Sequence, residues 1–169
     1  WHTTIWRFES NGYDRTLLHA IDFSNPLAPN EDAKPQPLRS TAADQMAELA
    51  RKVAEVRRLT GRDKVVLIGL SRGANAIRNY LKNGGGAAFV SHAILCGGAN
   101  HGVFDWEETR GNEFNAKGAF MTQLNAGPGE VVAGVRFLTI RSDSNDKYAQ
   151  PDGRFLGKPG RATHVGYDG

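Results

Sequence analysis

The sequence predicts an α/β fold in which a mainly parallel sheet carries helices on both faces. Short apolar runs of strand length alternate along the chain with longer segments of helical periodicity, an order of elements typical of such folds. The run Val65-Val66-Leu67-Ile68 is apolar at every position, as expected for a strand covered on both sides. With 169 residues, 40% of them hydrophobic, the chain is long enough to build a core, and we expect a single domain over residues 1–169.

Three segments are expected before the first long helix. Residues 1–10 predict a helix, because apolar side chains recur at helical spacing until Asn11-Gly12 ends them. Residues 15–23 predict a buried strand, since their middle is apolar. Residues 24–39 contain four prolines, which exclude a regular element and predict a polar loop.

A long helix is expected after this loop. Thr41-x-x-Asp44 is a capping-box pattern that opens it, and Gly61 is expected to end it. Its buried face would be one apolar stripe, formed by Met46, Leu49, Ala50, Val53 and Val56. The remaining elements are, in order, a strand over 64–68, a helix over 74–82, a strand over 88–96, an irregular segment over 99–130, a strand over 135–140 and a Gly- and Pro-rich tail over 150–169.

Ser71 is the strongest candidate for a functional residue. It lies at the centre of Gly69-Leu70-Ser71-Arg72-Gly73, a G-x-S-x-G sequence between a predicted strand and a predicted helix, where a nucleophile elbow exposes its serine. The two glycines predict a close crossing of the strand and helix backbones, and the backbone N–H of Arg72 would point at an oxyanion. The alternative is an ordinary strand-to-helix turn, because this composition gives about a one-in-ten chance of the pentapeptide occurring somewhere.

Composition and spacing argue against several other functions. The net charge of +3 comes from scattered Lys and Arg. The densest cluster, Arg51-Lys52 with Arg57-Arg58, falls on the polar face of a predicted helix without interleaved aromatic residues, so no nucleic-acid partner is expected. Cys96 is the only cysteine, which excludes an internal disulfide and disfavours a cysteine-based metal site.

No metal or cofactor is expected. Three histidines have no metal-ligand spacing to one another or to a carboxylate, namely His2, His19 and His92. The chain as given has no apolar run near 18 residues and no leader pattern, so neither a membrane span nor a signal peptide is expected in it. The sequence does not indicate an oligomeric state.

Two segments together resemble a known family. VVLIGLSRGAN (residues 65–75) and HAILCGGANHG (residues 92–102) are similar to the elbow and the next strand of bacterial lipases and esterases of the α/β-hydrolase superfamily, including polyester depolymerases. The resemblance extends over residues 64–151. It implies a Ser-His-Asp triad, an ester substrate that is a small molecule, a lipid or a polymer, and secretion or a periplasmic location.

The resemblance also implies the acid of the triad. Several of these lipases carry the pattern S-x-x-D-x-x-V-Q-P in the loop that here follows the predicted strand over 135–140. Aligning Gln150-Pro151 with this pattern makes Asp146 the acid, with Ala149 in the place of the valine. Asp143, which follows the predicted strand more closely, is the alternative. A carboxylate is needed there to hold an imidazole in one tautomer and to stabilise its cationic form. Both aspartates could also simply shape the loop.

The base of the triad is not settled by the sequence. In the family the histidine follows the acid, and His164 is the one histidine after Asp146, but no apolar strand precedes it. The alternative is a histidine beyond residue 169. The strand that would bring an early H-G element and its oxyanion amide is also not seen before Trp1. We therefore expect these 169 residues to be part of a larger hydrolase domain and to be inactive by themselves.

The segment over residues 99–130 is expected to be a cap or a substrate-facing loop. Its large apolar side chains would line an acyl pocket or anchor the loop on the core, and they are Phe104, Trp106, Phe114, Phe120 and Met121. His101-Gly102 resembles the H-G element but follows the wrong strand, so a loop role is expected for it. These observations together favour a serine esterase, and the rivals are a catalytically silent binding module of the same fold and a related acyl transferase or amidase.

Overall fold

A computed structural model describes residues 1–127 and 131–140. In these residues the helices and strands follow one another as α1 (His2–Ser10), α2 (Ala42–Thr60), β1 (Val65–Leu70), α3 (Arg72–Asn83), β2 (Val90–Cys96), α4 (Ala119–Asn125) and β3 (Arg136–Ile140). Short 3-10 turns lie at Arg15–Leu17, Gly86–Ala88 and Glu107–Thr109. The elements form an α/β fold, as the sequence predicts.

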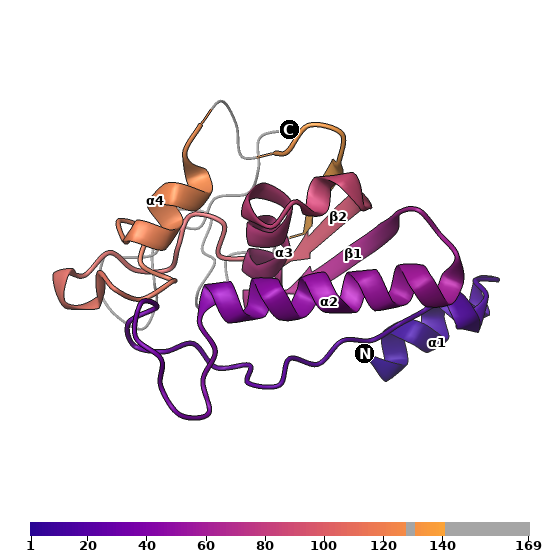
Figure 1. Cartoon of the computed structure of the whole chain (residues 1–169), viewed down its shortest axis with the longest axis horizontal. Helices are drawn as coiled ribbons and strands as arrows, with labels where there is room; N and C mark the ends of the chain where they lie inside the picture. Colours follow the sequence, from indigo (N-terminus) through magenta and orange to yellow (C-terminus); the bar gives the residue numbers. More distant parts are fainter. Residues whose placement is uncertain (128–130, 141–169) are drawn as a thin grey trace.

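The sheet is parallel and its strands lie in the order β1-β2-β3. Leu67 of β1 pairs with Ala93 of β2, which pairs with Phe137 of β3. Because all three strands run in the same direction, their carboxyl ends meet at one edge, and α3 leaves the sheet there. In the view of Figure 1, α4 and the long loop before it lie on the side of the molecule that this edge faces.

One face of the sheet is packed against α3, and α2 packs on α3 and contributes to the same core; Figure 1 shows α3 above α2. The core joins them to inward-facing strand residues, and its buried members include Leu49, Val53, Ile77, Tyr80, Leu81, Leu67, Ala93 and Leu95. Of the apolar stripe predicted for α2, Leu49 and Val53 are buried, and the other three members are half-buried, namely Met46, Ala50 and Val56.

The opposite face of the sheet differs from the expectation of helices on both sides. It presents the alternate residues of each strand, and four of its large apolar side chains are exposed, namely Val66, Leu70, Leu138 and Ile140. Among the described residues, helical cover is present only on the α2 and α3 side. The apolar character of the strands at consecutive positions thus predicts two covered faces, of which the described part of the chain supplies one.

The ends of α2 confirm the predicted capping. The Thr41 hydroxyl accepts a hydrogen bond from the Asp44 backbone N–H at 3.1 Å, and the Asp44 carboxylate accepts one from the Thr41 backbone N–H at 2.9 Å. Gly61 ends the helix in the left-handed conformation, with φ of 66°.

None of the described helices has both the length and the apolar character that crossing a membrane would require.

Two predicted segments are wrong. Residues 15–23 form a 3-10 turn followed by irregular backbone, because the Asp14 carboxylate accepts the Thr16 N–H at 2.9 Å and closes a turn. Ile21 and Phe23 still pack against the core, so their apolar character reflects burial and not pairing in the sheet. The segment 99–130, expected to be irregular, contains α4, whose Met121 and Leu124 are buried one helical turn apart.

Candidate active site

Ser71 lies in a strained turn between β1 and α3. Its backbone has φ of 54° and ψ of −121°, a conformation that residues with a Cβ rarely adopt, and its side chain is exposed. The predicted sequence of strand, turn and helix is therefore present, with β1 reaching Leu70 and α3 starting at Arg72. This geometry presents the Ser71 hydroxyl at the carboxyl edge of the sheet.

Gly69 allows the strand and the helix around Ser71 to cross closely. A Cβ built on Gly69 would lie 2.7 Å from the carbonyl oxygen of Gly73 and 2.7 Å from Cδ1 of Ile77. A Cβ on Gly73, by contrast, would meet no atom within 4 Å. The expectation that both glycines are needed for the crossing is therefore wrong for Gly73, whose α-carbon faces open space.

The ends of the neighbouring strands hold the turn in place. The Ser71 backbone N–H donates to the carbonyl of Cys96 at 2.9 Å, which continues the pairing of β1 with β2 up to the serine itself. Beyond β2, a Cβ on Gly98 would lie 2.7 Å from the Cβ of Ala74 in the first turn of α3. The backbone of Ser71 is thus fixed, while its hydroxyl is left accessible.

The first turn of α3 supplies backbone donors beside Ser71. The leading N–H groups of an α-helix have no acceptor within the helix, and that of Arg72 is the first of α3. The N–H of Ala74 already donates to the Ser71 carbonyl at 2.9 Å. These amides, together with the positive end of the dipole of a 12-residue helix, favour negative charge next to the Ser71 hydroxyl.

The side chain of Arg72 points into a buried polar network. Its Nε donates to Oε1 of Glu113 at 2.9 Å and its Nη2 to Oε2 at 2.5 Å, so that the ion pair has two points of contact. Further bonds from the guanidinium reach the carbonyl of Pro26 and both the carbonyl and the hydroxyl of Ser40. The side chain of Glu113 is only 2% exposed and that of Arg72 11%.

Burial dominates the electrostatics of this network. It raises the pKa of Glu113 above its ordinary value, although the Arg72 guanidinium acts in the opposite direction. The nearby Asn75 amide also favours the ionised form, but its position falls short of hydrogen-bond geometry. Burial likewise raises the pKa of Asp32, whose carboxylate accepts the Ala42 N–H at 2.7 Å.

The sequence gives no sign of this network. Glu113 lies in a polar loop, 41 residues from Arg72, and Ser40 lies 32 residues away on the other side. Neither belongs to a recognisable motif, and a charged residue in a loop is ordinarily expected to be exposed. The positions are brought together because the 24–41 and 99–118 loops meet beside the start of α3, where the Asp32 N–H donates to the carbonyl of Gly111 at 2.7 Å.

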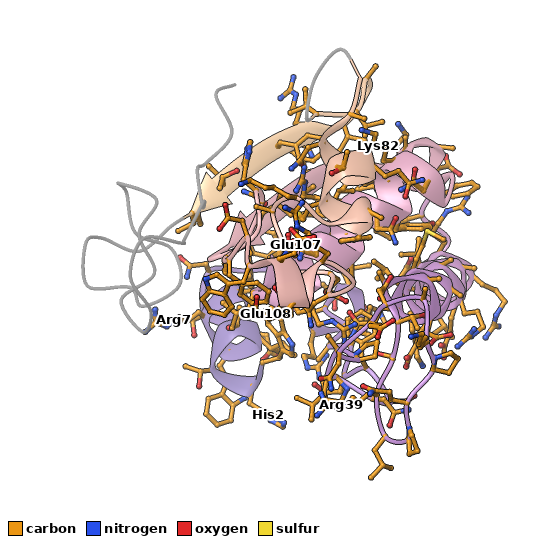
Figure 2. The ribbon with its side chains drawn as sticks, turned by 90° about the vertical axis from the view of Figure 1, so that its left-hand side faces the viewer. His2, Arg7, Arg39, Lys82, Glu107 and Glu108 are labelled. Atoms are coloured by element: carbon orange, nitrogen blue, oxygen red, sulfur yellow. The ribbon has the colours of Figure 1, made fainter. Side chains whose placement is uncertain are left out.

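The 99–118 loop is a folded unit. The Val103 N–H donates to the carbonyl of Phe114 at 2.9 Å, and the Ala116 N–H donates to that of Phe104 at 2.8 Å. Figure 2 faces this side of the molecule, with Glu107 and Glu108 at its centre. The rings of Phe104 and Trp106 stack with their centroids 4.9 Å apart.

The apolar side chains expected in an acyl pocket are partly used to hold the loop. Met121 is fully buried and therefore serves as an anchor, whereas Phe104, Trp106, Phe114 and Phe120 are half-buried. Two hollows formed by described residues lie elsewhere, one beside α1 and one at the end of α2. Their lining residues do not include Ser71.

The other candidate triad residues lie outside the described part of the chain. This applies to Asp146, to its alternative Asp143 and to His164. Of the histidines in the described residues, His101 is half-buried in the loop after β2, and the others lie at α1, beside the Arg15–Leu17 turn and on the uncovered face of the sheet. Within residues 1–127 and 131–140, no three His, Cys, Asp or Glu side chains are grouped as metal ligands.

Comparisons with known proteins give likenesses in structure and none in sequence. No family model matches the chain, and no curated protein matches its sequence. Among solved structures, the crystal structure of a Bacillus licheniformis lipase in its propeptide form is similar, with a TM-score of 0.45 and 21% identity. The likeness covers 58% of this chain and 25% of that one, so the matched stretch spans a quarter of that lipase chain.

Proposed function

We propose that this chain belongs to a serine hydrolase that cleaves carboxylic esters, with Ser71 as the nucleophile. The observation that carries the proposal is the turn at Ser71, where a strained and exposed serine stands against the first amides of α3. A strained conformation of this kind persists only where the surroundings hold it, and it is concentrated at functional sites. An ordinary strand-to-helix turn has no need of positive φ at a serine.

The chemistry proposed at this turn is acyl transfer in two stages. The Ser71 Oγ attacks the ester carbonyl carbon while a histidine removes its proton, and the carbonyl oxygen becomes an oxyanion that accepts a hydrogen bond from the Arg72 N–H. The ester C–O bond then breaks, and the leaving alkoxide takes the proton from the histidine. Water, deprotonated by the same histidine, releases the acid from the acyl-enzyme and restores the Ser71 hydroxyl.

The partners of Ser71 are part of the proposal. Asp146 would orient the histidine, with Asp143 as its alternative, and His164 is the candidate for the base within this chain. The buried position of Glu113 and its pairing with Arg72 make it unsuitable as the triad acid, because both of its oxygens accept from the guanidinium. No cofactor is required for this reaction, and none is proposed.

The proposed substrate is a small-molecule or polymeric ester. The half-buried Phe104 and Trp106 form a stacked apolar pair in the loop that meets the start of α3, which supports a role for residues 99–130 as a substrate-facing loop. A lipid, a short-chain ester and an aliphatic polyester would all present the same acyl carbonyl to Ser71. A panel of esters of increasing chain length would distinguish them.

Hydrolysis of p-nitrophenyl butyrate by the complete protein tests the proposal. We expect Ser71→Ala to lower kcat by about 10³-fold or more. Ser91→Ala is the matched control, because Ser91 lies near the opposite end of the sheet, where its hydroxyl donates to the carbonyl of Val65 at 3.2 Å, and it should leave kcat unchanged. Absence of hydrolysis by the unaltered protein would favour a silent binding module, and turnover that survives Ser71→Ala would exclude Ser71 as the nucleophile.

A further inference from the structure

We propose that Glu113 is a positioning residue for the reaction at Ser71, acting through the Arg72 guanidinium to fix the backbone N–H of Arg72 at the oxyanion. The inference rests on the proposed function, since it assigns a role to a residue that does not touch the substrate. It concerns a side chain that the motif around Ser71 does not include. Arg72 is thereby a residue with two separate tasks, one for its amide and one for its side chain.

The first support is that every N–H donor of the Arg72 guanidinium has a hydrogen-bond acceptor. An arginine side chain has five N–H donors, and Arg72 makes five hydrogen bonds to Glu113, Pro26 and Ser40. The two bonds to Glu113 run parallel from Nε and Nη2 to the two carboxylate oxygens, which fixes the plane of the guanidinium. The remaining bonds tie the same group to the loop that precedes α2.

The second support is the position in the sequence of the Arg72–Glu113 pair, which we call the clamp. Arg72 directly follows Ser71, whose φ of 54° is the strained point of the turn, so any rotation of the Arg72 backbone changes the peptide that joins the two residues. Contacts that hold the Arg72 side chain from the 24–41 and 99–118 loops therefore restrict the direction of its N–H. A displacement of about 1 Å at a reacting centre can cost on the order of 10²-fold in rate.

The third support is that the pair is a poor choice for stability alone. Glu113 and Arg72 are almost completely buried, and the desolvation of such a pair commonly offsets its attraction. Apolar side chains of similar size often serve a core equally well or better. What an ion pair with two parallel bonds adds is a single orientation, which an oxyanion donor requires and a core contact does not.

The experiment compares clamp variants of the complete protein with a control on the same helix. We expect Glu113→Gln and Arg72→Lys each to lower kcat for p-nitrophenyl butyrate by about 10- to 100-fold, with KM changed by less than about threefold. Binding of a boronic acid, which becomes tetrahedral on Ser71, should weaken in parallel with kcat/KM, as expected when an oxyanion contact is disturbed.

Lys82→Met is the matched control. Lys82 also ties α3 to a neighbouring segment, because its ammonium donates to the carbonyls of Leu124, at 2.8 Å, and Ala126. It lies at the far end of the helix from Ser71. Figure 2 shows it near the top of the view, well away from Arg39 of the loop before α2. Its loss should lower the free energy of unfolding while leaving kcat and boronate affinity unchanged.

A double variant, Arg72→Met with Glu113→Leu, keeps the proposal testable if the single variants fold poorly. It removes both charges and should fold, yet it should show the same loss of kcat as the single variants. Full kcat in the folded double variant, or an equal loss in Lys82→Met, would overturn the role of Glu113 while leaving Ser71 as the nucleophile. Failure of the proposed function would instead appear in the unaltered protein, as hydrolysis that is absent or independent of Ser71.

Discussion

The α-carbon of Gly69 lies so close to the carbonyl oxygen of Gly73 that a Cβ on Gly69 would stand 2.7 Å from it. Strand β1 and helix α3 therefore touch backbone to backbone on either side of Ser71, two residues before it and two after it. The contact is asymmetric, because a Cβ on Gly73 would enter open space. Of the two glycines of the motif, only Gly69 is required for this close contact, so alanine substitutions at the two positions should differ in their effect on stability.

Gly69→Ala should destabilise the fold by about 1–3 kcal/mol, the usual cost of forcing an extra group into a packed site. The new methyl group would press on backbone that cannot move without shifting α3. Gly73→Ala should be neutral or stabilising by up to about 1 kcal/mol, because alanine favours the helix and has room. Chemical denaturation of both variants measures the difference, and equal destabilisation by the two would contradict the asymmetry.

Ser71→Gly should stabilise the protein relative to Ser71→Ala by about 1 kcal/mol or more. Glycine adopts the backbone conformation of residue 71 without strain, whereas alanine keeps the Cβ that is responsible for it. Both variants lack the hydroxyl and should be equally inactive, so stability and activity are separated at one position. Equal midpoints of denaturation for the two variants would show that the turn is not strained.

The stability of the protein should carry a pH signature of Glu113. Because burial raises the pKa of this carboxyl, the folded protein binds its proton more tightly than the unfolded chain does. The contribution of Glu113 to the free energy of unfolding is therefore fully present below its unfolded pKa of about 4.3, and it is lost as the pH rises through the raised folded value.

The non-titrating variant Glu113→Gln supplies the reference for this measurement. The free energy of unfolding of the unaltered protein minus that of the variant should fall as the pH rises from about 4 towards neutrality. Denaturant titrations at a series of pH values measure it. A difference that grows with pH would mean that attraction to Arg72 outweighs burial and lowers the pKa of Glu113.

The two candidate acids should respond very differently to loss of charge. If Asp146 orients the histidine, Asp146→Asn should lower kcat of the complete protein by about 10³- to 10⁴-fold, because the amide favours the wrong tautomer of the imidazole. Asp143→Asn is the control and should cost far less. Steady-state hydrolysis of p-nitrophenyl butyrate ranks the two, and the reverse ranking would move the acid to Asp143.

Local patterns predict most of the fold here. The strand before Ser71, the helix after it and both ends of α2 follow from short-range signals, since a capping box or a helix-ending glycine acts within a few residues. The failure at residues 15–23 has the opposite cause. Apolar residues there predict burial, but whether a buried segment pairs in a sheet depends on a neighbouring strand, which the segment itself does not encode.

The site is predictable only where it is local. Ser71 and the Arg72 amide are predicted from five adjacent residues, because the G-x-S-x-G sequence indicates the turn that holds both of them. Glu113 and Ser40 could not be found in this way, because what makes them notable is burial against a residue more than 30 positions away. Only tertiary contact places them beside Arg72.

Covalent labelling of Ser71 tests the central claim most directly. A fluorophosphonate phosphonylates an activated serine, and we expect the complete protein to gain one adduct that peptide mapping places on Ser71. Ser71→Ala should gain none, while Ser91→Ala should label at the rate of the unaltered protein. An adduct on another residue, or an unaltered protein that stays unlabelled while correctly folded, would contradict the assignment of Ser71 as the nucleophile.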